Sequence, residues 1–235
     1  MEPVYPELLP RDPPPVEKMR DIQDRVRDLT RESVPFPFDP ETARIAGIDQ
    51  AFPDEQVRSA VVVWEDGEVI DRVVASVECR YPYVSGLLAF REAPAIMAAL
   101  GQLSVEPDVL LLDGNGRIHP KEAGLATHVG VTMDAPTVGV AKNLLCGTLV
   151  TPPKAPYPEG TRVPIRSGDR LLGYAVQTRQ WDHPKRCINP VYVSPGHRMD
   201  PETAVELVLG CVQGYKLPEP IRLADRFAGE TTGTG

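Results

Sequence analysis

The stretch PDVLLLDG, residues 107–114, indicates more about the fold than any other part of the sequence. A continuous apolar run that ends in Asp-Gly is typical of a central parallel strand buried on both faces. Open α/β sheets bind their ligands at the carboxyl ends of such strands. We therefore expect Asp113 to lie at the functional edge of a sheet.

The sequence on either side of this run alternates between strand and helix patterns. Three strands are predicted at 44–52, 59–65 and 69–80, with Asp66-Gly67 as the hairpin turn between the last two. Further strands are predicted at 136–142, 168–179 and 189–197. Helices are predicted at 16–31, from Pro94 onward, around 121–129, at 201–215 and at 217–227. Three consecutive strands, followed by strands that alternate with helices, predict an α/β fold with a central mixed sheet flanked by helices.

Length and composition indicate a single domain. Of the 235 residues, 1–15 form a proline-rich N-terminal extension, 16–227 the domain and 228–235 a flexible tail. No apolar run approaches the roughly 18 residues of a membrane span, and the N-terminus lacks a secretory signal. The four cysteines, which lack metal-ligand spacing, are expected to be reduced. We therefore expect a cytoplasmic monomer that does not associate with membranes.

Three acidic residues occupy positions that suggest chemistry. Asp49 interrupts the apolar strand IAGIDQAF, where a carboxylate is costly unless it is paired or binds a metal. Asp113 closes the central strand, although Asp-Gly is also a common strand-ending turn. Glu92 lies where LAFRE meets the predicted helix, and there it could equally be a helix N-terminal charge. Oxygen ligands on adjacent strand ends suit Mg²⁺ or Mn²⁺.

Two further residues suggest that this metal site acts on phosphate esters. His119 follows Asp113 in DGNGRIHP, and Lys142 ends the strand PTVGVAK. A histidine can orient or protonate a reacting group, and a lysine can hold a phosphate as a point charge. Each could also be an ordinary loop or surface residue. The net charge of −8 argues against a passive nucleic-acid coat, but a cluster of metal-binding carboxylates contributes to such a charge.

Several blocks together resemble the endonuclease V family. These blocks are GIDQAF, PYVSGLLAFREAP, PDVLLLDGNGRIHPKEAGLATHVGV, PTVGVAKNLLCG, YVSPGH and LPEPIRLAD, and they occur in the family's order. The resemblance implies a ribonuclease H-like fold and a nuclease that uses Mg²⁺, with Mn²⁺ as a substitute. It implies hydrolysis of the second phosphodiester on the three-prime side of deoxyinosine or inosine. DNA containing deoxyinosine is then the expected partner, and inosine-containing RNA or single strands are further candidates.

The resemblance also assigns roles to individual residues. It implies that Asp49 and Asp113 bind metal, that Glu92 is catalytic, and that Asp225 lies near the metal. For Asp225 an ordinary surface charge on a helix is an equal alternative. His119 and Lys142 match catalytic positions near the scissile phosphate. The implied strand-separating wedge and base pocket comprise Pro82, Tyr83, Val84, Ser85, Gly86, Leu88 and Gly114.

Two positions depart from the family's pattern. Ser85 replaces the second proline of the Pro-Tyr-Ile-Pro wedge, so a less rigid tip should separate a paired duplex less well. Gln50 stands where an aliphatic residue is usual. Two alternatives to a repair nuclease therefore stay open. One is a nuclease that prefers particular structures, single strands or RNA, and the other is a catalytically silent nucleic-acid-binding protein.

Overall fold

The computed structural model describes residues 1–32, 39, 42–150, 157–180 and 188–230. The proline-punctuated sequence at 33–41 predicts a linker, and most of it lies outside the described part. Cys187 and residues 231–235 of the predicted tail also lie outside it. No helix in the described ranges combines the length and the apolar character needed to cross a bilayer.

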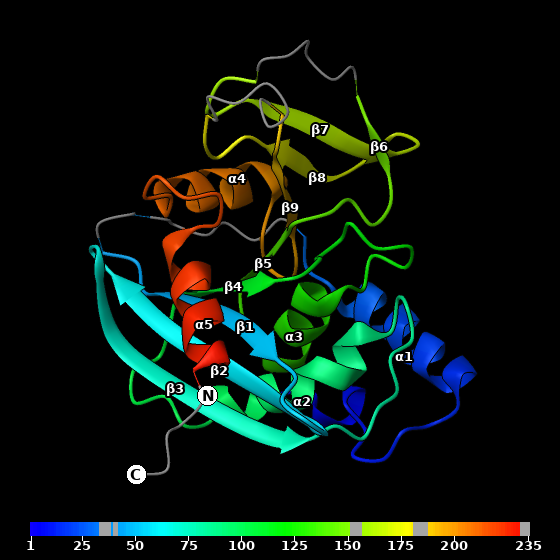
Figure 1. The fold of residues 1–235 in the computed structure, drawn as a ribbon. Coiled ribbons are helices and arrows are strands. Elements are labelled where there is room, and N and C mark those ends of the chain that lie inside the picture. The colour runs from blue at the N-terminus through cyan, green and yellow to red at the C-terminus, as the bar shows by residue number, and fades with distance from the viewer. Residues whose placement is uncertain (33–38, 40–41, 151–156, 181–187, 231–235) are drawn as a thin grey trace.

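One mixed sheet organises the molecule, and its strands follow the order β3-β2-β1-β4-β5-β9-β8-β7-β6 (Figure 1). The central strands β1, β4 and β5 are parallel, and the outer pairings are antiparallel. The predicted mixed sheet is therefore confirmed. The strands are β1 (Ile45–Ala51), β2 (Gln56–Glu65), β3 (Glu68–Glu78), β4 (Val109–Asp113), β5 (Thr137–Ala141), β6 (Thr148–Leu149), β7 (Arg162–Ser167), β8 (Arg170–Val176) and β9 (Val191–Pro195).

Helices cover both faces of the sheet, as predicted. They are α1 (Val16–Leu29), α2 (Leu88–Leu100), α3 (Leu125–Met133), α4 (Pro201–Gly210) and α5 (Glu219–Gly229), with a short 3₁₀ helix η1 (Pro6–Leu8). In β4, Leu110 and Leu112 pack in the cluster formed with α2 and α3, whereas Val109 and Leu111 pack in the cluster formed with α4 and α5. The apolar run of β4 is thus buried on both faces because helices lie on both.

The predicted hairpin is confirmed in detail. Strands β2 and β3 pair antiparallel, and Asp66 and Gly67 between them have φ values of 46° and 80°. Two consecutive positive φ values define the type I′ turn, whose twist matches that of the strands it joins.

Three predictions about local structure were wrong. Helix α2 begins at Leu88 and contains Pro94, which the sequence analysis placed at the helix start. A proline inside a helix removes only one backbone hydrogen bond, and here α2 is packed tightly against the sheet. Helix α3 begins at Leu125 and not near residue 121. Strand β7 was missed because the proline at 164 and its proline-rich neighbourhood hid the alternation of buried and exposed residues.

The N-terminal extension packs on the domain. Leu8 is 1% exposed, and its carbonyl oxygen lies 2.9 Å from Nε2 of His128. The backbone N–H groups of Val4 and Tyr5 both donate to the carbonyl of Thr132. These contacts place η1 against α3, and the hydroxyl of Tyr81, in the loop that follows β3, donates to the carbonyl of Pro10 just beyond η1.

Candidate functional site

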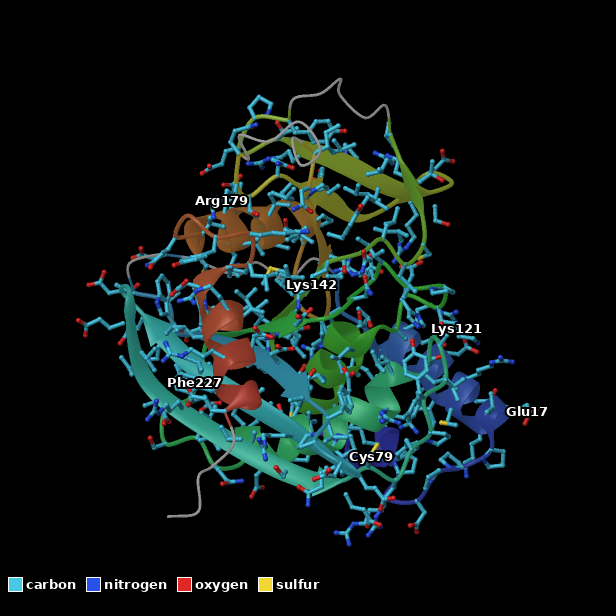
Figure 2. The ribbon with its side chains drawn as sticks, in the orientation of Figure 1. Glu17, Cys79, Lys121, Lys142, Arg179 and Phe227 are labelled. Atoms are coloured by element: carbon cyan, nitrogen blue, oxygen red, sulfur yellow. The ribbon has the colours of Figure 1, made fainter. Side chains whose placement is uncertain are left out.

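The parallel pairing of β1 with β4 brings two aspartates to one edge of the sheet. Ile48 is the register partner of Leu112, so the next residues, Asp49 and Asp113, lie at the same level. Asp113 in turn pairs with Val140 of β5, and β5 ends at Ala141, immediately before Lys142. The Nζ atom of Lys142 lies 2.6 Å from Oδ2 of Asp113. Figure 2 shows Lys142 near the centre of the molecule.

A third aspartate reaches this edge because α5 lies directly on β1 (Figure 1). The close approach depends on Gly47, where a Cβ atom would lie 2.1 Å from the backbone carbonyl of Pro220. Asp225, on the same helix, hydrogen-bonds with Asp49. The structure therefore places Asp225 beside Asp49.

Glu92 completes the acid cluster from the other face. It lies in the second turn of α2 and is 6% exposed. Burial, followed by the nearby charges of Asp113 and Asp49, raises the pKa of Glu92 to about 8. Because α2 begins at Leu88, Glu92 lies inside the helix and not at its end, as a buried acid near the two aspartates.

The carboxylates of this cluster are buried and repel one another. Asp49 is 8% exposed, and burial, the charge of Asp113 and the hydrogen bond with Asp225 raise its pKa to about 8. Buried carboxylates that repel one another are stabilised by protons or by a bound cation. Within the described ranges, no group of three or more His, Cys, Asp or Glu side chains is arranged as it would be around a bound metal ion. The acids form an open, all-oxygen cluster, which fits a hard cation that keeps several water ligands.

A small cavity of about 120 Å³ adjoins the acid cluster. Its lining includes six of the seven predicted wedge and pocket residues, and Pro82 lies outside it. Sequence reasoning missed Asn115, Ala89, Ala123, Gly124, Leu125 and Leu145, most of which lie in the quoted sequence blocks and could have been found there. The lining comprises Tyr83, Val84, Ser85, Gly86, Leu88, Ala89, Gly114, Asn115, His119, Ala123, Gly124, Leu125 and Leu145.

His119 lies in this cavity and not among the acids. Its Nε2 atom is 3.0 Å from the carbonyl oxygen of Gly86, and its Nδ1 accepts the backbone N–H of Lys121. Burial lowers the pKa of His119. Tyr83 stands at the rim with 72% of its surface exposed. The structure thus joins the four acids and Lys142 in one cluster and places His119 with the predicted wedge.

Comparison with known proteins places this arrangement in a family. The Endonuclease V family model matches residues 28–226. Endonuclease V of Haloarcula marismortui is 55% identical over 198 residues, which cover 81% of this chain and 73% of that protein. The structure of Endonuclease V from Streptomyces avermitilis has a TM-score of 0.82 at 36% identity and covers 92% of each chain.

A third similar protein was solved with nucleic acid. Ciona intestinalis Endonuclease V, in complex with a 24mer DNA containing an inosine followed by a ribo-adenosine, has a TM-score of 0.75 at 27% identity. The match covers 91% of this chain and 95% of that one.

The mixed sheet, with helices on both faces and acids at the central strand ends, defines a nuclease of the ribonuclease H-like fold class. The chain belongs to the endonuclease V family and is an endonuclease.

Proposed function

We propose that this enzyme hydrolyses the second phosphodiester on the three-prime side of inosine, the product of adenine deamination, in nucleic acid. One observation carries the proposal: Asp113 belongs to the acid cluster, and the next residue, Gly114, lines the cavity. A base held in the cavity therefore fixes the strand so that a neighbouring phosphate reaches the acids. The inosine-containing DNA bound by the Ciona relative supports this substrate class.

The acid cluster would hold Mg²⁺, and Mn²⁺ as a substitute, through Asp49, Asp113 and Asp225. Hard cations of this kind prefer carboxylate oxygens. A bound ion of this type activates water and offsets the charge that develops on the phosphate. Asp225 is carried to the ion by α5, and its hydrogen bond to Asp49 supports a shared site.

Two residues of the chain then position the phosphate and accept the proton of the attacking water. Glu92, buried beside Asp49 and Asp113 with a raised pKa, takes up the proton of the attacking water at a carboxylate oxygen. Lys142, whose ammonium group is half exposed beside Asp113, contacts a phosphate oxygen. The in-line displacement leaves a three-prime hydroxyl and a five-prime phosphate.

The rim and the cavity select the base. The exposed ring of Tyr83 can stack in the space that an extruded base leaves, a contact worth about 1–3 kcal/mol. A cavity of about 120 Å³ is of the size of one base. Hypoxanthine carries a carbonyl and an N–H where adenine carries an amine, and fixed backbone groups read that difference.

Ser85 favours a second candidate, an inosine nuclease that prefers single strands or RNA. Its side chain lies in the loop that should part the duplex, where it lacks the rigidity of proline. A catalytically silent binding protein has less support, because the four acids and Lys142 are all in place.

Cleavage of end-labelled oligonucleotides with Mg²⁺ tests the proposal. The set contains DNA and RNA, single and double strands, each with and without one inosine. The expected result is a single cut at the second phosphodiester on the three-prime side of the inosine. EDTA should abolish this cut. The strand type that is cut fastest decides between the two candidates. Binding of the inosine strand without any cut would overturn the enzymatic assignment of these residues.

A further inference from the structure

The carbonyl oxygen of Gly86 accepts hydrogen bonds from two buried side chains. The Nε2 atom of Gln23 donates to it at 2.6 Å, and the Nε2 atom of His119 lies 3.0 Å from it. Gln23 and His119 are only 2% and 5% exposed. Gln23 belongs to α1 and is 63 residues from Gly86 in sequence. Gly86 ends the loop at 82–86, here called the recognition loop, and its φ of 80° is one that few other residues adopt.

The hydrogen bonds of His119 fix its tautomer. Because Nδ1 accepts the backbone N–H of Lys121 at 3.1 Å, the ring proton lies on Nε2 and is donated to Gly86. Both ring nitrogens are therefore engaged. A histidine in this state holds a loop in place and has no free proton to give to a leaving group.

The other end of the recognition loop is also held. The hydroxyl of Tyr81 donates to the carbonyl of Pro10 at 2.5 Å, and Nη1 of Arg91 donates to the carbonyl of Tyr81 at 2.9 Å. An ion pair of 2.5 Å between Asp24 and Lys121 ties α1 to the loop after β4, and Figure 2 shows Lys121 beside α1. The contacts from residues 10 and 23 arise outside the region 28–226 that the family model matches.

We propose that Gln23 and His119 are positioning residues that clamp the recognition loop in its binding conformation. The proposal rests on the proposed function, because it concerns how the cavity receives the base. A loop that is already ordered loses little conformational entropy when it binds, so the clamp lowers the cost of engaging the substrate. Loss of the clamp should therefore weaken substrate engagement more than the chemical step.

Steady-state cleavage of an inosine oligonucleotide separates these effects. Gln23→Met keeps the length of the side chain and removes the donor, and we expect KM to rise about five- to tenfold while kcat changes less than about threefold. Gln102→Met is the control, since Gln102 lies in the exposed turn just after α2 and its side chain donates to the nearby carbonyl of Ala98. Kinetics of Gln23→Met equal to those of the control would overturn the clamp.

Two substitutions of His119 distinguish positioning from proton transfer. The Nε2 amide of His119→Gln can donate to Gly86 but does not titrate, so this variant should keep most of the activity and the pH–rate profile of the wild type. His119→Ala should raise KM. If His119→Gln loses as much rate as His119→Ala and a limb of the pH profile disappears, His119 is a proton donor and the proposal fails.

Hydrogen exchange tests the clamp independently of cleavage. Amides of the recognition loop should exchange about five- to tenfold faster in Gln23→Met than in wild type, with no change in Gln102→Met. Unchanged exchange would overturn the clamp even if the enzyme cuts inosine. Faster exchange in an enzyme that fails to cut inosine would instead keep the clamp and overturn the proposed function.

Discussion

At the scale of single residues, the proposed chemistry depends most on Asp113. It interacts with both Asp49 and Glu92, and it is in direct contact with Lys142. Asp113→Ala should lower kcat by roughly a thousandfold or more, because several kcal/mol of charge stabilisation are lost. In EDTA, its melting temperature should stay near that of the wild type, since the carboxylate is at the sheet edge. Asp169→Ala, in an exposed turn, is the control. Unfolding of the Asp113 variant, or unchanged turnover, would count against the assignment.

Tyr83 is the residue that we expect to separate strands. Tyr83→Ala should weaken binding to an inosine-containing duplex by about 1–3 kcal/mol, through loss of the stacked ring. The loss should be smaller on an inosine-containing single strand, which needs no separation. Titration of both labelled substrates gives the comparison. Equal losses on the two would mean that Tyr83 contributes contact area without acting as a wedge.

At the scale of elements, the docking of α5 on β1 decides whether Asp225 reaches the site. Gly47→Ala places a methyl group 2.1 Å from backbone atoms of Pro220, so the helix must move. We expect a loss of stability of about 1–3 kcal/mol and a larger loss of activity. Gly229→Ala, in the same helix with nothing within 4 Å, is the control. Denaturant unfolding and cleavage rate together give the test, and activity that falls only in proportion to stability would argue against a site role for α5.

Helix α3 carries a histidine that should make the fold sensitive to acid. His128 is fully buried against Leu8 and Phe90, and burial lowers its pKa to about 4. Between that value and the ordinary pKa of about 6.5, the unfolded chain binds a proton that the folded chain excludes. This contribution to stability is therefore present above pH 6.5 and is lost as pH falls toward 4, by on the order of 3 kcal/mol.

His128→Gln tests this source of acid sensitivity, because glutamine does not titrate in that range. Melting temperatures of the wild type and the variant, measured from pH 7 to pH 4.5, should converge as the pH falls. Parallel curves would show that acid lability comes from other groups. The variant's lower stability at pH 7 does not affect the comparison, since the slope is the readout.

At the scale of the whole molecule, the sequence predicted the sheet and its acids but not the contacts between distant segments. Buried strands such as β4 and a mid-strand acid such as Asp49 leave local signals, because burial and charge conflict within a few residues. The start of α2 was wrong because Pro94 is also a common helix-start signal. The Gln23–Gly86 contact left no local signal, since it depends on how separate elements pack.

The proposed metal site in the acid cluster should also link metal binding to global stability. Four carboxylates gather at one edge of a chain with a net charge of −8, and burial and mutual repulsion already raise the pKa of Asp49 and Glu92. An ion that binds the folded chain alone stabilises it by RT ln(1 + [L]/Kd), about 2.7 kcal/mol at a hundredfold excess over Kd. For a domain of this length that corresponds to a rise in Tm of roughly 5–10 °C.

Thermal unfolding in EDTA and in Mg²⁺ at equal ionic strength measures this stabilisation. The wild type should melt higher in Mg²⁺, and Asp113→Asn should lose most of the shift, because a neutral amide binds the ion poorly while filling the same space. Asp169→Asn should keep the full shift. A shift of equal size in all three proteins would mean that Mg²⁺ screens surface charge in general, and the cluster of Asp49, Asp113 and Asp225 would then no longer explain the ion's effect.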